Sequence, residues 1–403
     1  MKHIYIFNYA KSKGYVFGIG TYIQQLLQMK NYGYAVHVVH LNAEVAEVTV
    51  EIKDGVEEIL FPNPILVPQN KIIYDNYHTN VTKILRSYID ITADNIFHLN
   101  NLYILSLANS IKRYLNGKTV LTIHFSQSLF NLKGNITKLH EIIQSPASED
   151  DPPLYSTVRN EIKDAGQMIN QYVDRVISIA KHSYRQNNEI YKIPNVKNVM
   201  IYNSLCDEFN DGLNKSDELK KQLGINWSGK IIIYAGRLDE IKGVQCLLQA
   251  LSILKSKGIL FHLFIAGNGH FEATIDFASD LYTNITFTGL LNKEKLYQLY
   301  SIADIGVFPS LYEEFGYVIL EMMLHRLPVV GYRTSSTAEI VEDGHTGLLA
   351  ELSFDQQEQS IRNLAKKIEY LLVNPEECRR MGSAGRKRFL KYFSTKTFNK
   401  KIA

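Results

Sequence analysis

Two glutamates, Glu313 and Glu321, stand eight positions apart in the apolar stretch PSLYEEFGYVILEMM. A carboxylate accepts two hydroxyl hydrogen bonds, so each of them can hold a vicinal diol of a sugar. Phe315 and Gly316 lie at the expected start of a helix over 317–325, where free backbone N–H groups favour a phosphate. The alternative is an acid that stabilises the helix N-terminus and a second glutamate in a surface ion pair. Because the neighbours of Glu321 are apolar, we expect it to be partly buried and to have a partner.

Two cations, Arg237 and Lys242, lie five residues apart in GRLDEIKG, directly after the strand-like run KIIIYA. A planar guanidinium together with a mobile ammonium suits a diphosphate. The alternative is a pair of solvated loop charges beside Asp239 and Glu240. If the loop follows a buried strand, both cations stand where ligands bind in open α/β sheets.

Glycines join the first strand-like run to the first helical pattern, in GYVFGIGTY. Gly14, Gly18 and Gly20 would allow a backbone to approach a ligand closely. Ile23 stands where the dinucleotide fingerprint has its third glycine, so this is not that motif. A turn with no ligand explains the same residues.

Two histidines end apolar runs, His98 in NIFH and His124 in VLTIH. Both should lie at the carboxyl edge of a sheet, either as catalytic groups or as hydrogen-bonding and packing residues. The sequence contains no pair of aspartates in D-x-D spacing, so no metal held by paired aspartates is expected.

The chain alternates short apolar runs with amphipathic stretches twice over its 403 residues. This alternation predicts an α/β protein of two Rossmann-like, doubly wound parallel sheets facing across a cleft. We expect one domain over 1–205, joined by a closing helix over 386–403, and a second over 206–385. Residues 127–171 read as irregular.

Composition excludes several classes of protein. The net charge of +3 does not suggest a nucleic-acid partner, and no apolar stretch is long enough to span a membrane. Three dispersed cysteines fit a reducing cytosol, and no signal peptide is evident, so a cytoplasmic location is expected. The basic segment RRMGSAGRKRFLKYF either contacts anionic lipid at the inner face of a membrane or solvates a packed helix.

The motifs GRLDEIKG, EEFGYVILE and PVVG, in this order and spacing, resemble glycosyltransferase family 4. These are retaining nucleotide-sugar transferases with the GT-B fold. The likeness covers nearly the whole chain and is most specific over 231–350. Where that family often has two glycines, this chain has Ser335 and Ser336.

The resemblance implies a role for each candidate residue. Glu321 would grip the ribose, Glu313 the transferred sugar, and Arg237 and Lys242 the diphosphate. His124 would line the reaction centre. The other donor contacts implied are Gly18, the backbone amides of Phe315, Gly316 and Tyr317, and, near the base, Gly267, Gly269 and Leu291.

By the same resemblance, the chain moves a hexose from a nucleotide-sugar donor to an acceptor hydroxyl without a metal or cofactor, in glycan or polysaccharide synthesis. A UDP-sugar is favoured and GDP-mannose is the alternative. The acceptor would be a carbohydrate, a lipid-linked molecule or a peptide, contacted by residues 127–171 and 61–80. Two other functions remain open: a non-catalytic nucleotide-sugar-binding subunit, and a GT-B epimerase acting on the nucleotide sugar.

Overall fold

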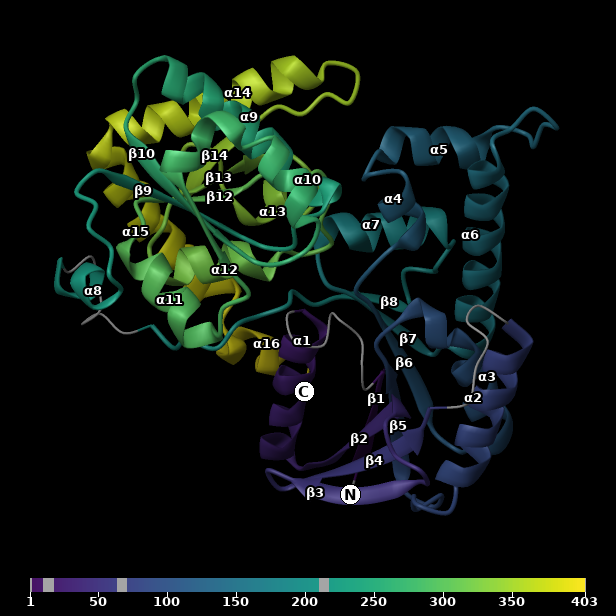
Figure 1. Ribbon diagram of the computed structural model, residues 1–403. Helices are drawn as coiled ribbons and strands as arrows, with labels where there is room; N and C mark the ends of the chain where they lie inside the picture. Colours follow the sequence, from purple (N-terminus) through teal and green to yellow (C-terminus); the bar gives the residue numbers. More distant parts are fainter. Residues whose placement is uncertain (1, 10–17, 64–70, 210–216, 403) are drawn as a thin grey trace. The chain divides into compact units, whose positions relative to one another are not determined.

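The computed structural model describes residues 2–9, 18–63, 71–209 and 217–402. The chain divides into two compact units. Unit 1 comprises Met1–Ser128, Thr137–Ser204 and Thr395–Ala403, and unit 2 comprises Leu129–Ile136 and Leu205–Ser394. Within the described residues, each unit contains its own largely parallel sheet with helices on both faces, as the sequence predicts (Figure 1).

Unit 1 contains eight described strands, in the order β3-β4-β2-β1-β5-β6-β7-β8. All neighbours are parallel except the β3–β4 pair at the edge. The strands are β1 (Lys2–Tyr9), β2 (Tyr34–Ala43), β3 (Thr49–Lys53), β4 (Val56–Pro62), β5 (Asp94–Leu99), β6 (Lys118–Ile123), β7 (Arg175–Ser178) and β8 (Asn198–Met200). The helices with residues in this unit are α1 (Ile19–Leu26), η1 (Leu27–Tyr32), α2 (Lys71–Leu85), η2 (Leu102–Ile104), α3 (Leu105–Tyr114), α4 (Gln127–Asn131), α5 (Ile136–Gln144), α6 (Pro153–Tyr172), α7 (Lys181–Ile190) and α16 (Thr395–Ile402).

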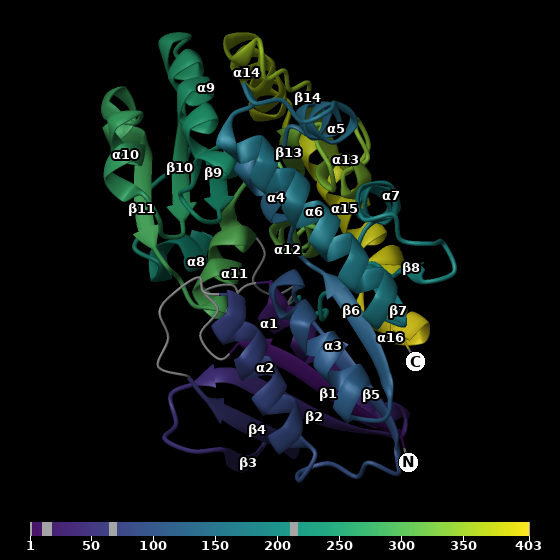
Figure 2. The ribbon, with the colours of Figure 1, turned by 90° about the vertical axis from the view of Figure 1, so that its right-hand side faces the viewer.

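The side chains of β1 point alternately to the two faces of the unit 1 sheet. Ile4 and Ile6 pack in one buried cluster with Tyr22 of α1 and Phe398 of α16. Helices α2, α3 and α6 pack side by side on the other face (Figure 2). Residues at alternate positions of a strand point to opposite faces, so one short apolar run supports two helical layers.

Unit 2 contains a fully parallel sheet within the described residues, in the order β11-β10-β9-β12-β13-β14. The strands are β9 (Lys230–Ala235), β10 (Phe261–Ala266), β11 (Ile285–Gly289), β12 (Ile305–Phe308), β13 (Val329–Tyr332) and β14 (Gly347–Ala350). The helices are α8 (Asp217–Gln222), η4 (Glu240–Lys242), α9 (Val244–Ser256), α10 (Phe271–Asp276), η5 (Ser279–Asn284), α11 (Lys293–Ile302), α12 (Tyr317–Leu324), α13 (Thr337–Ile340), α14 (Gln357–Val373) and α15 (Pro375–Tyr392).

The central strands of unit 2 are buried on both faces, which explains why they read as continuous apolar runs. Ile231, Ile232 and Ile233 of β9 have no exposed surface. Helices α9 and α14 pack against each other, and α12 packs against α15. The sheet of unit 2 is therefore covered by packed helices, and the ends of its strands carry the loops of interest.

Two predicted segments differ from the structure. The sequence predicts residues 127–171 to be irregular, but they form α4, α5 and most of α6. In α6, the apolar residues Val158, Ile162, Ala165 and Ile169 recur at helical spacing, and this pattern outweighs the turn-prone residues before them. The predicted closing helix over 386–403 is two helices. Residues 386–392 are the end of α15 in unit 2, whereas α16 lies in unit 1, the unit that the closing segment is predicted to join.

Part of the predicted loop over 61–80 is also helical. Residues 64–70 lie outside the described residues, and α2 begins at Lys71. None of the described helices has a stretch both long enough and apolar enough to cross a bilayer.

Candidate functional site

The candidate site lies at the carboxyl ends of two neighbouring strands of unit 2. Strands β10 and β11 lie on one side of β9 in the sheet, and β12, β13 and β14 lie on its other side. The direction in which successive strands are added therefore reverses between β9 and β12. Ligands of open α/β sheets bind at such a reversal point. Arg237 and Lys242 follow β9, and Glu313 follows β12. The strand order thus brings these three predicted residues to one edge of the sheet.

The loops after β9 and β12 are joined through their backbones. The N–H of Leu311 donates to the carbonyl of Ile241 at 2.9 Å, and the Ser310 hydroxyl donates to the same oxygen at 3.2 Å. Gly243 has φ +69°, and a Cβ there would lie 1.9 Å from the carbonyl oxygen of Pro309. Glycine is therefore required for the two loops to approach this closely.

Lys242 and Glu313 form an ion pair between these loops. The two side chains are only 19% and 25% exposed, so the pair is partly shielded from water. The loop after β13 holds the backbone of Glu313. The Ser335 hydroxyl accepts from the Glu313 N–H at 3.1 Å, and the Ser336 hydroxyl donates to the Glu313 carbonyl at 3.0 Å. Ser335 and Ser336 thus fix the position of the backbone of this glutamate.

Arg237 is more open to solvent than Lys242. Its side chain is 53% exposed and lies 3.0 Å from the carboxylate of Asp239. Its carbonyl oxygen accepts a hydrogen bond of 2.6 Å from the hydroxyl of Tyr234, a fully buried residue of β9. The backbone at Arg237 is therefore anchored, while its guanidinium remains accessible to a ligand.

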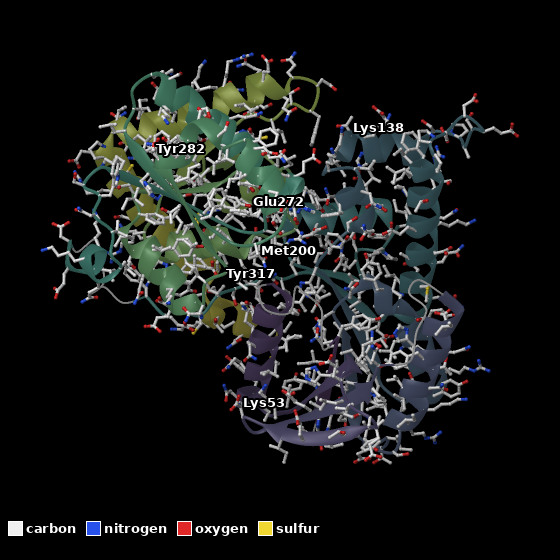
Figure 3. The ribbon with its side chains drawn as sticks, in the orientation of Figure 1. Lys53, Lys138, Met200, Glu272, Tyr282 and Tyr317 are labelled. Atoms are coloured by element: carbon white, nitrogen blue, oxygen red, sulfur yellow. The ribbon has the colours of Figure 1, made fainter. Side chains whose placement is uncertain are left out.

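The N-terminus of α12 begins at the end of the same loop. Gly316 caps it with φ +86°, a conformation that glycine adopts readily. The Phe315 side chain is 2% exposed and packs edge-on against Tyr317, which Figure 3 labels, and against Phe393. The side chain of Phe315 therefore belongs to the core, and the backbone N–H groups at this helix end are what can contact a ligand.

Glu321 lies on α12, one turn after its start, and is half-buried. The hydroxyl of Tyr300, on α11, donates to its Oε2 at 3.1 Å. Burial raises the pKa of Glu321 to about 7, although the Tyr300 hydrogen bond and the charge of Lys293 act in the opposite direction. Among the described residues this carboxylate makes no ion pair, and its hydrogen-bond partner is Tyr300.

Gly267 and Gly269 are explained by the packing of loops. With φ +153°, Gly267 would place a Cβ 1.8 Å from the carbonyl oxygen of Gly236. Gly269, with φ +144°, would place one 2.8 Å from the backbone nitrogen of Leu238. Leu291 follows β11 and is partly buried. These positions shape the edge of the sheet beside β9, and their contact with a base stays a prediction.

His124 and Gly18 belong to unit 1. His124 follows β6, with its ring 4.6 Å from that of Tyr22, and its buried Nε2 has no hydrogen-bond partner among the described residues. Burial, with a smaller effect of His98, lowers the pKa of His124 to about 3. The ring is neutral at physiological pH, so it can donate or accept a hydrogen bond but carries no charge.

The other residues predicted in unit 1 have ordinary surroundings. Gly18 caps α1 with φ −112°, and a Cβ there would meet nothing within 4 Å. Gly14 lies outside the described residues. His98 is 4% exposed, and its Nε2 is 2.8 Å from the hydroxyl of Thr122. His98 is thus a hydrogen-bonded core residue.

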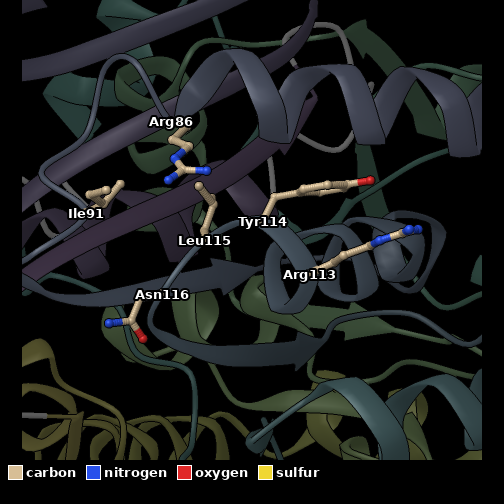
Figure 4. Close-up of a pocket in the computed structure, with 6 residues that line it drawn as sticks. All are labelled: Arg86, Ile91, Arg113, Tyr114, Leu115 and Asn116. Atoms are coloured by element: carbon tan, nitrogen blue, oxygen red, sulfur yellow. The ribbon is translucent and has the colours of Figure 1, made fainter.

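Unit 1 also contains a cavity of about 270 Å³, which is lined by other residues than His98 and His124 (Figure 4). Its lining includes Ile91, shortly before β5, and Leu115 and Asn116, shortly before β6. It therefore opens at the amino ends of these strands, whereas His98 and His124 lie at their carboxyl ends. Its arginines, Arg86 and Arg113, do not point toward one another in Figure 4.

Four arginines of the basic helix α15 form ion pairs within unit 2. Arg379 and Arg380 pair with Glu376 and Glu377 one turn earlier on the same helix. Arg386 and Arg388 pair with Asp207 and Glu342. These contacts favour the solvated, packed helix over the lipid-binding surface. In the part of the chain that the structure describes, no group of three or more His, Cys, Asp or Glu side chains is placed to hold a metal ion.

Sequence reasoning did not identify Tyr300, Asp239, Ser335 or Ser336 as parts of this arrangement. Each acts on a predicted residue through a contact that depends on the fold. Tyr300 lies in a helical pattern of mixed residues, LYQLYSI, and nothing in that pattern marks it as the partner of Glu321.

Comparison with known proteins gives relatives for the second half of the chain and for its fold. Residues 215–388, which lie largely within unit 2, match the family model of the glycosyl transferases group 1. Over 180 residues the chain is 32% identical to an alpha-D-kanosaminyltransferase of Streptomyces kanamyceticus, covering 43% of this chain and 45% of that protein. The chain thus spans about half the length of the curated relatives that it matches.

Solved structures match over the whole chain. A sucrose-phosphate synthase from Thermosynechococcus elongatus has a TM-score of 0.77 at 19% identity, covering 100% of this chain and 97% of that one. HepE of Anabaena, solved in complex with UDP-glucose, has a TM-score of 0.68 at 18% identity, covering 100% and 98%. These likenesses confirm the predicted fold class: the chain has the GT-B fold.

Proposed function

We propose that this protein is a glycosyltransferase that moves a sugar from a nucleoside-diphosphate sugar to an acceptor hydroxyl, with retention of the anomeric configuration. The observation that carries the proposal is the meeting of Lys242 and Glu313, from the loops after neighbouring strands β9 and β12, beside the N-terminus of α12. A cation, a carboxylate and a helix N-terminus are the groups that a diphosphate-linked sugar needs. The match of residues 215–388 to the glycosyl transferases group 1 supports it.

In this proposal the pairing of Lys242 with Glu313 describes the site before the donor binds. The ammonium would exchange the carboxylate for diphosphate oxygens, and Glu313 would then accept from hydroxyls of the transferred sugar. Arg237, whose side chain is 53% exposed, would reach the same diphosphate. Glu321 would hold the ribose diol, and His124 would hydrogen-bond the sugar as a neutral ring.

The chemistry then follows from charge. As the bond from C1 of the sugar to the diphosphate oxygen breaks, negative charge grows on the leaving group. Lys242, Arg237 and the amides of α12 would stabilise that charge, so we propose that no metal ion is needed. The acceptor oxygen bonds C1 on the face that the diphosphate leaves, and the acceptor proton passes to a diphosphate oxygen. The products are the glycosylated acceptor and the nucleoside diphosphate.

We propose a UDP-sugar as the donor, with GDP-mannose as the alternative. HepE was solved with UDP-glucose, which supports the first choice. Thermal unfolding with UDP, GDP and ADP would test it, because a ligand that binds the folded state raises the unfolding midpoint by mass action. A rise with GDP and none with UDP would reverse the choice, and no rise with any nucleotide would contradict the proposal.

Turnover tests the assignment of the cations. Lys242→Ala and Arg237→Ala should each lower the rate of nucleoside diphosphate release from the preferred sugar nucleotide at least ~10²-fold. Lys257→Ala is the matched control, since Lys257 also pairs with a glutamate, Glu369, in unit 2 but lies at the far end of α9. Unchanged turnover in both site variants would defeat the assignment. Binding of UDP with no turnover by the unaltered protein would instead indicate a non-catalytic binding subunit.

A further inference from the structure

Tyr300 lies on α11 and is completely buried. Its hydroxyl donates to Oε2 of Glu321 at 3.1 Å, and burial raises the pKa of Tyr300 far above its ordinary value. The hydroxyl therefore keeps its proton at any physiological pH. It is a permanent donor directed at one oxygen of the carboxylate.

Two other titratable groups near Glu321, His325 and Lys293, have partners other than its carboxylate. The His325 ring Nδ1 lies 2.8 Å from the backbone carbonyl of Glu321, and burial lowers the pKa of that ring to about 4. A neutral ring with this contact donates to the carbonyl and not to the carboxylate. Lys293 acts on Glu321 through its charge only, and its ammonium pairs with Glu208 at 2.6 Å.

Tyr297, one turn before Tyr300 on α11, also faces this region. Its ring lies 4.5 Å from that of His325, and its buried hydroxyl has no hydrogen-bond partner among the described residues. Within the same set of residues, the Tyr300 hydroxyl is the donor to the Glu321 carboxylate. Burial, followed by the charge of Glu321, raises the pKa of both tyrosines, so both interact with that charge, but among the described residues the hydrogen bond to its carboxylate comes from Tyr300.

We infer that Tyr300 is a positioning residue that holds Glu321 as an oriented carboxylate for the ribose diol of the nucleotide. The inference rests on the proposed function. The hydrogen bond from Tyr300 uses one lone pair of Oε2 and restricts the orientation of the carboxylate. The second lone pair of Oε2 and both lone pairs of Oε1 then remain to accept from the two hydroxyls of a diol. The same hydrogen bond favours the charged form of a carboxylate that burial disfavours.

Removing the hydroxyl should therefore affect nucleotide binding in a pH-dependent way. Without the donor the pKa of Glu321 rises further above about 7, and more of the protein carries a protonated glutamate at neutral pH. We expect Tyr300→Phe to bind UDP about tenfold more weakly at neutral pH, because less of Glu321 is ionised and the remaining carboxylate is no longer held in one orientation. The loss should shrink toward about pH 9, where the carboxylate is ionised in both proteins.

The experiment is titration calorimetry of UDP binding at several values from about pH 6 to about pH 9, on full-length protein. Tyr297→Phe is the matched control, since it removes the same atom from the same helix without removing a hydrogen bond to the Glu321 carboxylate. The phosphate of UDP also titrates in this range, but its effect is common to all variants and cancels in their ratio. Repeating the comparison with Glu321→Gln completes a double-mutant cycle.

The outcomes separate the inference from the proposed function. No UDP binding by the unaltered protein at any pH contradicts the proposed UDP site. If the protein binds UDP, a pH profile of Tyr300→Phe that matches the unaltered protein, or an equal effect of Tyr297→Phe, overturns the inference. The inference is supported if Tyr300→Phe alone shifts the profile and no longer does so in the Glu321→Gln background. If Tyr300→Phe fails to fold, Glu321→Gln should restore folding, and failure to do so also overturns it.

Discussion

The close approach of the β9 and β12 loops can be tested at Gly243. This residue immediately precedes α9, and Gly258 lies just beyond the other end of the same helix. Both have left-handed backbones, with φ +69° and φ +77°. A Cβ at Gly243 would meet the Pro309 carbonyl oxygen at 1.9 Å, whereas a Cβ at Gly258 would meet nothing within 4 Å. The pair of alanine variants therefore separates backbone strain from steric conflict.

The magnitudes follow from these surroundings. An alanine in the left-handed region costs about 1–2 kcal/mol, and this is the whole expected loss for Gly258→Ala. Gly243→Ala should lose the same amount plus about 1–3 kcal/mol, because a backbone carbonyl cannot move aside as a flexible side chain can. The expected difference between the variants is thus about 1–3 kcal/mol in the free energy of unfolding of unit 2.

The assay uses the single tryptophan of the chain, Trp227. It belongs to unit 2, is half-buried, and donates from its indole to the Lys230 carbonyl at 3.1 Å. Its fluorescence during urea unfolding therefore reports on unit 2 and not on unit 1. Gly243→Ala should also weaken UDP binding, because it displaces the loop that carries Lys242. Equal losses of stability in the two alanine variants would refute the argument that the loop contact requires glycine.

The remaining predictions concern buried polar and titratable groups. Because the pKa of folded Glu321, about 7, lies above its ordinary value of 4.5, this residue destabilises unit 2 progressively as pH rises from 4.5 through 7. Glu321→Gln, which can still accept from Tyr300, should stabilise unit 2 by roughly 3 kcal/mol above about pH 8 and have little effect below about pH 4, as measured by Trp227 fluorescence; a constant effect across that range would contradict the assignment. In unit 1, the Thr122 hydroxyl lies 2.9 Å from the Tyr22 hydroxyl and 2.8 Å from Nε2 of His98. Thr122→Val should cost about 2 kcal/mol, seen as faster hydrogen exchange in β6, because two buried polar groups lose a partner; unaltered exchange there would show that neither group depends on it. Burial lowers the pKa of His98 from 6.5 to about 3, so unit 1 should lose stability as pH falls from 6.5 toward 3.

The sequence by itself determined the architecture of two largely parallel sheets and pointed to the loops that follow their strands. Apolar runs such as KIIIYA alternate with amphipathic stretches, and this periodicity is local, so it can be read without knowing which strands are neighbours. Ligand sites of such sheets follow the strands, which singled out Arg237, Lys242 and Glu313. The same reasoning failed for 127–171, where turn-prone residues hid three helices.

The tertiary structure alone decided which partner each of these side chains has. Lys242 and Glu313 are 71 residues apart, and they meet because β9 and β12 are neighbours in the sheet, a pairing that no local pattern encodes. Likewise, Glu321 has its partner because α11 and α12 place Tyr300 beside it. Burial also made His124 a neutral ring and explained Gly267 and Gly269 by the approach of neighbouring backbones. Hydrogen bonds and desolvation act over a few ångströms in space, so they depend on strand order and helix packing and cannot be read along the chain.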